Sequence, residues 1–211
     1  MVESDLLDLM NQNWLNTPDG RQGWASWFVQ NGYTVYIVDQ PQRGRSAYNP
    51  DGSLGTFSAE AISTLFTGVQ YLKLWPQAHL HTQWPGVQVQ TKTQNAGAAL
   101  LDRIGPAVLI AHSEGGPLGF TIADVRPSLV KALISIEPEG PPFEDRFPPS
   151  SKIKRPFGLT NIPITYDPPV RDPATDLPIN TTPRAGPHLS NWWLRAKPVF
   201  MPCTTTAQCD I

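Results

Sequence analysis

Three short apolar runs, each bounded by turn residues, predict buried β-strands. They are residues 32–39 (GYTVYIVD), 107–111 (AVLIA) and 132–136 (ALISI). Strands that are apolar on both faces are typical of the centre of a parallel sheet. A fourth run, residues 198–201 (PVFM), predicts one more short strand late in the chain.

Between these runs the pattern changes to a helical one. The predicted helices are residues 23–30, 58–67, 93–104 and 119–125. Ser58 is a candidate N-cap, and we expect Trp24, Trp27 and Phe28 of the first helix to pack on the sheet. The alternation of strand and helix predicts an α/β fold with a mostly parallel sheet.

Prolines change the pattern after residue 137. The chain has 23 prolines among 211 residues, about twice the usual share of roughly 5%. Residues 138–195 are therefore predicted to be a lid-like excursion without regular structure. We assign residues 1–211 to a single domain, with an atypical N-terminus at 1–12 and an atypical tail at 202–211.

Composition and charge narrow the classes of partner. The chain is 40% hydrophobic and 16% charged, with a formal net charge of −2. It shows no basic stripe for nucleic acid and no apolar window of about 20 residues for a membrane span. We expect a small ester or another apolar ligand as the partner, and leave the oligomeric state open between monomer and dimer.

No cofactor or metal site is predicted. The two cysteines, Cys203 and Cys209, lie close together in the tail and offer too few ligands for a metal, and no phosphate-binding loop is present. The first ten residues (MVESDLLDLM) do not read as a signal peptide. The default expectation is a cytoplasmic protein, and a secreted one if the natural chain starts further upstream.

The strongest chemical signal is the turn after the second strand. Residues 111–115 (AHSEG) follow an apolar strand and precede a helix, as in the nucleophile elbow G-x-S-x-G. Small residues at the flanking positions, Ala111 and Gly115, allow the tight turn that exposes the hydroxyl of Ser113. The backbone N–H of Glu114 is the predicted oxyanion donor. The competing interpretation is that Ser113 is only an ordinary helix N-cap.

A serine nucleophile requires a base and an orienting acid. Glu137 ends the third strand, so it is expected at the same sheet edge as Ser113; otherwise it is a surface carboxylate. His188 is the candidate base, since it follows the acid in the chain, although a structural loop histidine is the competing interpretation. The remaining histidines precede the acid: His79, His81 and His112.

Several segments together resemble the esterase 713-like branch of the α/β-hydrolases. They are residues 16–21 (NTPDGR), 23–46 (ending DQPQRGRS), 111–116 (AHSEGG), 136–143 (IEPEGPPF) and 158–170 (GLTNIPITYDPPV). The resemblance covers roughly residues 13–170, with a weaker tail to about 201. It implies a Ser–Glu–His triad in which Ser113 matches the nucleophile and Glu137 the acid.

Two parts of the family pattern are not found. The family has a strand and a glycine-rich oxyanion loop where this chain has residues 1–10, and a histidine after the strand that residues 198–201 resemble. We therefore expect a carboxylic-ester hydrolase by lineage that is truncated at both ends and impaired. The alternatives are a non-catalytic protein of the same fold that binds a small ligand or partner, and another hydrolase such as a lactonase or a haloperoxidase-like enzyme.

Two further groups have open interpretations. Tryptophans either line an acyl pocket or, more commonly, pack in the core; they are Trp75, Trp84, Trp192 and Trp193. Arg43 and Arg45 either bind an anion or are solvated turn residues, and we favour the second interpretation.

Overall fold

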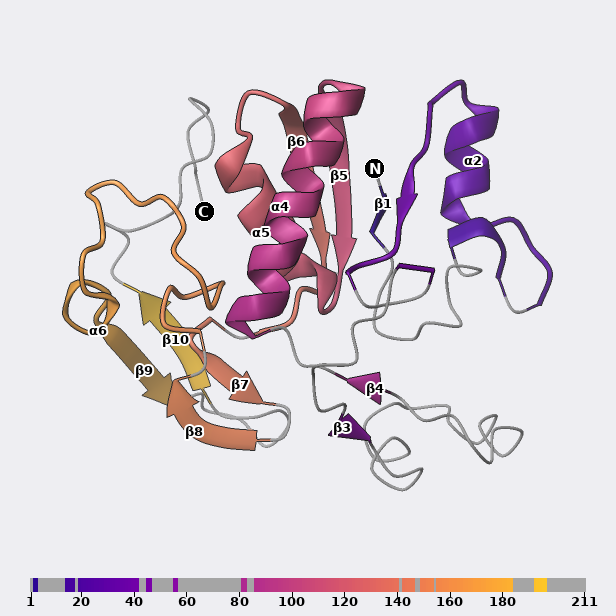
Figure 1. Cartoon of the computed structure of the whole chain (residues 1–211). Coiled ribbons are helices and arrows are strands. Elements are labelled where there is room, and N and C mark those ends of the chain that lie inside the picture. Colours follow the sequence, from indigo (N-terminus) through magenta and orange to yellow (C-terminus); the bar gives the residue numbers. More distant parts are fainter. Residues whose placement is uncertain are drawn as a thin grey trace.

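The structure is a computed structural model of the whole chain (Figure 1). It describes residues 2–3, 14–17, 19–41, 45–46, 55–56, 81–82, 86–140, 142–146, 149–153, 155–183 and 192–196. The helix predicted at 58–67 and the strand predicted at 198–201 lie outside the described residues.

A four-stranded parallel sheet forms the centre of the fold. Its order is β2-β1-β5-β6, and its strands are β1 (Val2–Glu3), β2 (Ile37–Val38), β5 (Ala107–His112) and β6 (Val130–Ile136). The chain runs from β1 to β2 on one side and later places β5 on the other side of β1. The connection therefore changes direction between β1 and β5, which makes this a topological switch point. Helices with a parallel sheet confirm the predicted α/β class.

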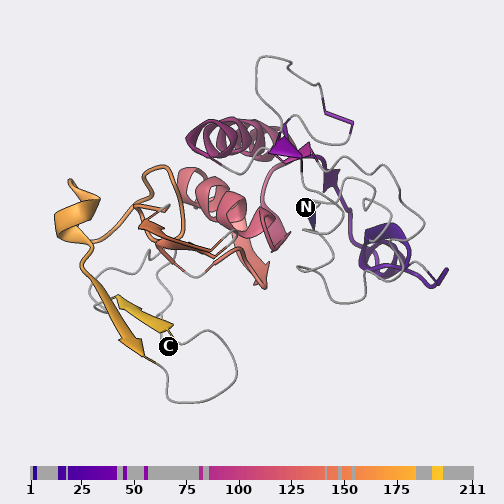
Figure 2. The same ribbon diagram turned by 90° about the horizontal axis from the view of Figure 1, so that it is seen from below.

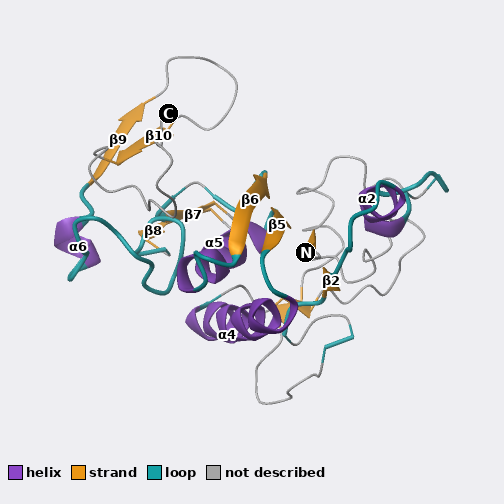
Figure 3. Ribbon diagram, turned by 90° about the horizontal axis from the view of Figure 1, so that it is seen from above, coloured by secondary structure: helices purple, strands orange, loops and turns teal. Residues whose placement is uncertain are grey.

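One face of this sheet is covered by two helices, α4 (Val87–Ile104) and α5 (Gly115–Val125). Figures 2 and 3 show them on the same side of β5 and β6. The core between helices and sheet is a set of fully or largely buried apolar side chains: Leu101, Leu109, Ile122, Ala123 and Val130. Gly97 allows the two helices to approach closely, because a Cβ there would lie 2.4 Å from Cδ1 of Ile122.

The lengths of the elements differ from the prediction. Only Ile37 and Val38 of the run at 32–39 are in a strand, because the neighbouring β1 is itself two residues long. Helix α4 begins six residues before the predicted start at residue 93, and α5 begins at Gly115 rather than at residue 119. Its first turn holds two glycines and a proline, which are poor interior helix residues but are tolerated in a first turn where packing requires them.

Helix α2 (Trp24–Gln30) is present where expected, but the packing predicted for its tryptophans is wrong. Trp24 and Trp27 are each 53% exposed, and the only buried residue of the helix is Ala25. Their rings instead contact nearby aromatic rings at 5.2–5.6 Å between centroids: Trp14 with Trp24, and Trp27 with Phe28. The helix therefore buries the side that carries Ala25. The two tryptophans lie at the surface, where they contact neighbouring aromatic rings.

The proline-rich region has regular structure, contrary to the prediction. Its elements are β7 (Glu144–Arg146), β8 (Pro149–Ile153), α6 (Pro173–Asp176), β9 (Ile179–Pro183) and β10 (Trp192–Ala196). Strands β7 and β8 pair antiparallel, as do β9 and β10. Outside this region, β3 (Gly55–Thr56) and β4 (His81–Thr82) form another antiparallel pair. Each proline-containing pair is a two-stranded ribbon, whose open edges accommodate residues that lack an N–H. A small second core accompanies this region: Phe143, Ile164, Tyr166 and Leu177.

Among the helices that the structure describes, none is long and apolar enough to cross a membrane.

Candidate active site

Ser113 occupies a sharp turn between β5 and α5. Its φ of 51° lies in the left-handed region, which a non-glycine residue rarely adopts. Its N–H donates to the carbonyl of Ile136 at 3.1 Å, and its own carbonyl accepts from the N–H of Gly116 at 3.0 Å. Strained backbone of this kind persists where surrounding contacts hold it in place, and it concentrates at functional sites.

The turn is tight because small residues surround it. A Cβ on Gly116 would lie 2.4 Å from Cβ and 2.8 Å from Cα of Pro138. Gly119 one turn later is similarly close, since its Cβ would lie 3.1 Å from the side chain of Ala111. Glycine at these positions allows the start of α5 to approach the sheet, which holds the serine at the strand-to-helix corner.

Glu114 follows Ser113 and is the N-cap residue of α5. Its side chain is buried, with 1% of the residue exposed. The unpaired N–H groups of a first helical turn, together with the helix dipole, favour negative charge at this end of a helix.

Glu137 lies next to Ser113 at the same edge of the sheet. His112 and Ile136 are partners in the β5–β6 register, so the two residues that follow them leave the sheet side by side. Glu137 is exposed and also has a positive φ, 42°. Both positions follow the carboxyl ends of parallel strands, and Ser113 stands beside the switch point, where open α/β sheets bind their ligands.

The loop after Glu137 contains an ion pair that the sequence did not indicate. Nη1 of Arg155 lies 3.3 Å from Oε1 of Glu139, with the side chains 4% and 16% exposed. The N–H of Glu139 donates to the carbonyl of Ser113 at 2.7 Å. Glu139 was visible in the sequence as a second carboxylate two residues after Glu137, but nothing there indicated Arg155 as its partner.

The structure does not place the predicted base, because His188 lies outside the described residues. His79 is also outside them, and His81 is described only as part of β4. His112 ends β5 and is half-buried. Trp75 and Trp84 lie outside the described residues too, and Trp192 and Trp193 belong to β10.

A groove of about 640 Å³ lies away from Ser113. It is lined mainly by apolar residues of β5, β6 and the segment before β2, among them Tyr33, Tyr36, Val108 and Ile134. Neither Ser113 nor Glu137 is among its lining residues, so this groove is separate from the site around Ser113. Within the described part of the chain, no cluster of His, Cys, Asp and Glu has the composition of a metal site.

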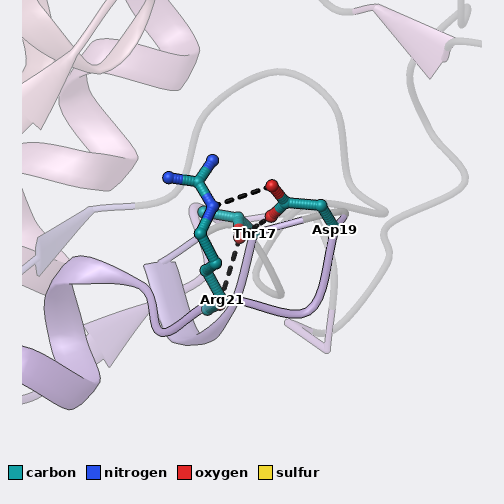
Figure 4. Close-up of polar contacts among 3 residues, drawn as sticks. All are labelled: Thr17, Asp19 and Arg21. Atoms are coloured by element: carbon teal, nitrogen blue, oxygen red, sulfur yellow. Dashed lines mark hydrogen bonds and ion pairs between the residues drawn. The ribbon is translucent and has the colours of Figure 1, made fainter.

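The described residues of the segment 16–21 (NTPDGR), all but Pro18, form a turn just before α2 whose side chains bond to one another (Figure 4). Thr17 donates its hydroxyl hydrogen to Asp19, and Nε of Arg21 donates to Asp19 at 2.7 Å. The hydrogen bond from Thr17 and, to a smaller extent, the one from Arg21 lower the pKa of Asp19 to about 2. The side chains of Arg21 and Asp19 are exposed, so the described contacts of this motif are those of a structural turn.

Arg45 is paired as well. Its Nε donates to Oδ2 of Asp39 at 2.8 Å, and its backbone N–H donates to the same oxygen at 3.2 Å. The Arg45 side chain is 76% exposed, whereas that of Asp39 is 5% exposed. Arg45 is thus a turn residue that bonds to Asp39, directly after the end of β2. Arg43 lies outside the described residues.

No protein-family profile matches the chain. A fungal protein named probable secreted lipase phiG (Fungal sp., strain ATCC 74256) is 46% identical over 189 residues, which cover 78% of this chain and 51% of that protein. This chain is similar to a lipase. It spans about half the length of that relative.

Proposed function

We propose that the chain belongs to a serine hydrolase of the α/β-hydrolase fold that cleaves carboxylic esters. The observation that carries the proposal is the backbone of Ser113, a non-glycine residue at φ 51° between a parallel strand and a helix. This is the geometry that a nucleophile elbow requires, and it costs free energy that an ordinary N-cap does not. The similarity to a probable secreted lipase supports the same class of substrate.

In the proposed reaction, the Ser113 oxygen attacks the ester carbonyl while a histidine takes its proton. The tetrahedral oxyanion then accepts a hydrogen bond from the backbone N–H of Glu114. Collapse expels the alcohol, which takes the proton from the histidine, and water releases the acid in a second, equivalent cycle. Glu137 orients the histidine, and His188 is the proposed base, since it follows Glu137 in the chain.

We propose that this chain by itself is a slow catalyst. In this fold the base normally follows the last strand, whereas His188 precedes the run at residues 198–201. A serine without a well-placed base typically loses several orders of magnitude in rate.

The test is hydrolysis of p-nitrophenyl acetate and longer p-nitrophenyl esters by the purified chain, beside Ser113→Ala, Glu137→Gln and His188→Ala. We expect weak hydrolysis that Ser113→Ala abolishes and that the other two variants reduce. Covalent labelling by a fluorophosphonate should modify Ser113 and be absent from Ser113→Ala. A folded chain in which Ser113→Ala changes neither hydrolysis nor labelling rules the proposal out.

A second candidate is a non-catalytic protein that binds a small apolar ligand. The groove beside Val108 and Ile134 favours it, because these apolar side chains are 38% and 46% exposed. Binding of a fluorescent apolar probe that Val108→Lys removes, and that Ser113→Ala leaves unchanged, would support this function. Probe binding that Val108→Lys does not alter would exclude it.

A further inference from the structure

The loop that leaves β6 holds Ser113 from two sides. The carbonyl of Ile136 accepts the N–H of Ser113 at 3.1 Å, and the N–H of Glu139 donates to the carbonyl of Ser113 at 2.7 Å. Both polar groups of the Ser113 backbone thus contact a stretch of only four residues, 136–139. Any displacement of this loop would therefore displace the strained turn.

The loop is in turn fixed by the side chain of Glu139. Its carboxylate lies 3.3 Å from the guanidinium of Arg155, and the Arg155 side chain is only 4% exposed. A buried ion pair contributes little net stability, because desolvation offsets the attraction. Such a pair is better explained as a device that specifies one arrangement of the chain.

Arg155 is itself held by the second core. Its N–H donates to the carbonyl of Phe143 at 3.2 Å, and its carbonyl accepts from Gly158 at 3.0 Å. The N–H of Phe143 donates to the carbonyl of Gly158 at 2.7 Å, and the Phe143 ring is buried in the second core. A continuous series of contacts therefore connects this core, through Arg155 and Glu139, to the backbone of Ser113.

The two carboxylates of the segment Glu137-Pro138-Glu139 consequently differ in role. Glu137 is exposed at the sheet edge, where a base can reach it. Glu139 is largely buried and is engaged by a cation that neutralises its charge.

We propose that Glu139 and Arg155 are positioning residues that hold the Ser113 turn in its strained geometry. The effect on the backbone stands by itself, and the effect on catalysis rests on the proposed ester hydrolysis. A purely structural pair would stabilise the region near Phe143 without altering the turn at Ser113.

The first test is amide hydrogen exchange followed by mass spectrometry. We expect Glu139→Gln and Arg155→Met to speed exchange at least about tenfold in peptides covering 111–118 and 136–143, and Arg155→Lys to restore much of the protection. Helix α4 should exchange as in the unmodified chain. Exchange at 111–118 that is unchanged in folded variants would overturn the proposal.

Two further variants keep the test decisive. Arg126→Met removes an exposed ion pair with Asp102 and should leave exchange at 111–118 unchanged. If a single variant does not fold because one buried charge remains, the double variant Glu139→Leu/Arg155→Met removes both charges and should fold. Fast exchange at Ser113 in that double variant supports the positioning role, and normal protection overturns it.

Kinetics separate this proposal from the proposed function. If the chain hydrolyses esters, Glu139→Gln and Arg155→Met should lower kcat at least about tenfold with KM nearly unchanged, since misplacement of a reacting group affects the chemical step. If the chain is inactive but exchange at 111–118 responds, the positioning holds and the hydrolase proposal fails. If the chain is active but neither its exchange at 111–118 nor its kcat changes in these variants, the hydrolase proposal holds and the positioning proposal fails.

Discussion

Two neighbouring regions of this molecule are held together by different forces. The elbow region, residues 86–140, joins α4, α5, β5 and β6 through apolar side chains and close-packed glycines. The segment 155–177 makes polar contacts with both of these helices. Gln90 of α4 accepts the N–H groups of Asn161 and Ile162 at 2.7 and 3.2 Å, and Asp124 of α5 accepts that of Thr165 at 2.8 Å.

The difference indicates how each region responds to change. Apolar packing is sensitive to volume, so the elbow region should respond to added or removed methyl groups. Buried hydrogen bonds are sensitive to the loss of one partner, so the attached segment should respond to isosteric changes in polarity. The Glu139–Arg155 pair belongs to both regions, which is why it bears on the site.

The largest expected effect is on the apolar core. Leu101 is fully buried between α4 and the sheet, so Leu101→Ala should lower the free energy of unfolding by about 2–5 kcal/mol. Urea denaturation measures this loss. Leu15→Ala, at a leucine that is 42% exposed, is the control and should cost less than about 0.5 kcal/mol. Equal losses would show that the described core is not the stabilising one.

Adding a single methyl group beside the elbow should be nearly as costly. Gly116→Ala places a Cβ 2.8 Å from the backbone Cα of Pro138, which cannot rotate away. We expect a loss of about 1–3 kcal/mol in the free energy of unfolding. Gly140→Ala is the matched control, since its nearest contact would be at 3.6 Å. Thermal or urea unfolding that cannot distinguish the two variants would contradict the close approach.

The polar attachment is tested by Gln90→Leu. This change keeps the size of the side chain but leaves the N–H groups of Asn161 and Ile162 without their acceptor. The cost should be about 1–3 kcal/mol, and limited proteolysis should cut the segment 155–177 faster. Gln88→Leu, on an exposed position of the same helix, should change neither quantity. Unaltered proteolysis of Gln90→Leu would show that other contacts attach the segment.

The smallest effect concerns Tyr166. Its hydroxyl donates to the carbonyl of Phe157 at 2.6 Å, so Tyr166→Phe should cost about 1 kcal/mol. Burial, and secondarily the charge of Asp124, raises the pKa of Tyr166 to about 12. A raised folded-state pKa gives stability that is present below the ordinary value of 10.0 and is lost as the pH rises from about 10 to 12.

Alkaline unfolding measures this contribution directly. Tyr166→Phe should lose less stability than the unmodified chain between about pH 10 and 12, whereas Tyr33→Phe, at a residue that is 61% exposed, should behave like the unmodified chain. An identical alkaline loss in Tyr166→Phe would contradict the assigned environment of the hydroxyl.

The segments that were predictable are those whose own pattern is unambiguous. The run at 107–111 forms β5, and the small residues around Ser113 form a strand-to-helix turn with a positive φ. By contrast, β1 (Val2–Glu3), which lies between β2 and β5, was not among the predicted strands, because two residues are too few to give a periodic pattern.

The sequence by itself determined the local chemistry: an apolar strand, a small-residue turn around Ser113, and a carboxylate at the end of the next strand. Those features depend on neighbouring residues and on the period of the backbone. Only the tertiary structure decided which carboxylate is buried and what pairs with it. Glu139 and Arg155 are 16 residues apart in number, and no local pattern connects them. Their pairing follows from how a proline-rich segment packs against the sheet edge, and long-range packing of that kind is not encoded in any single stretch of the chain.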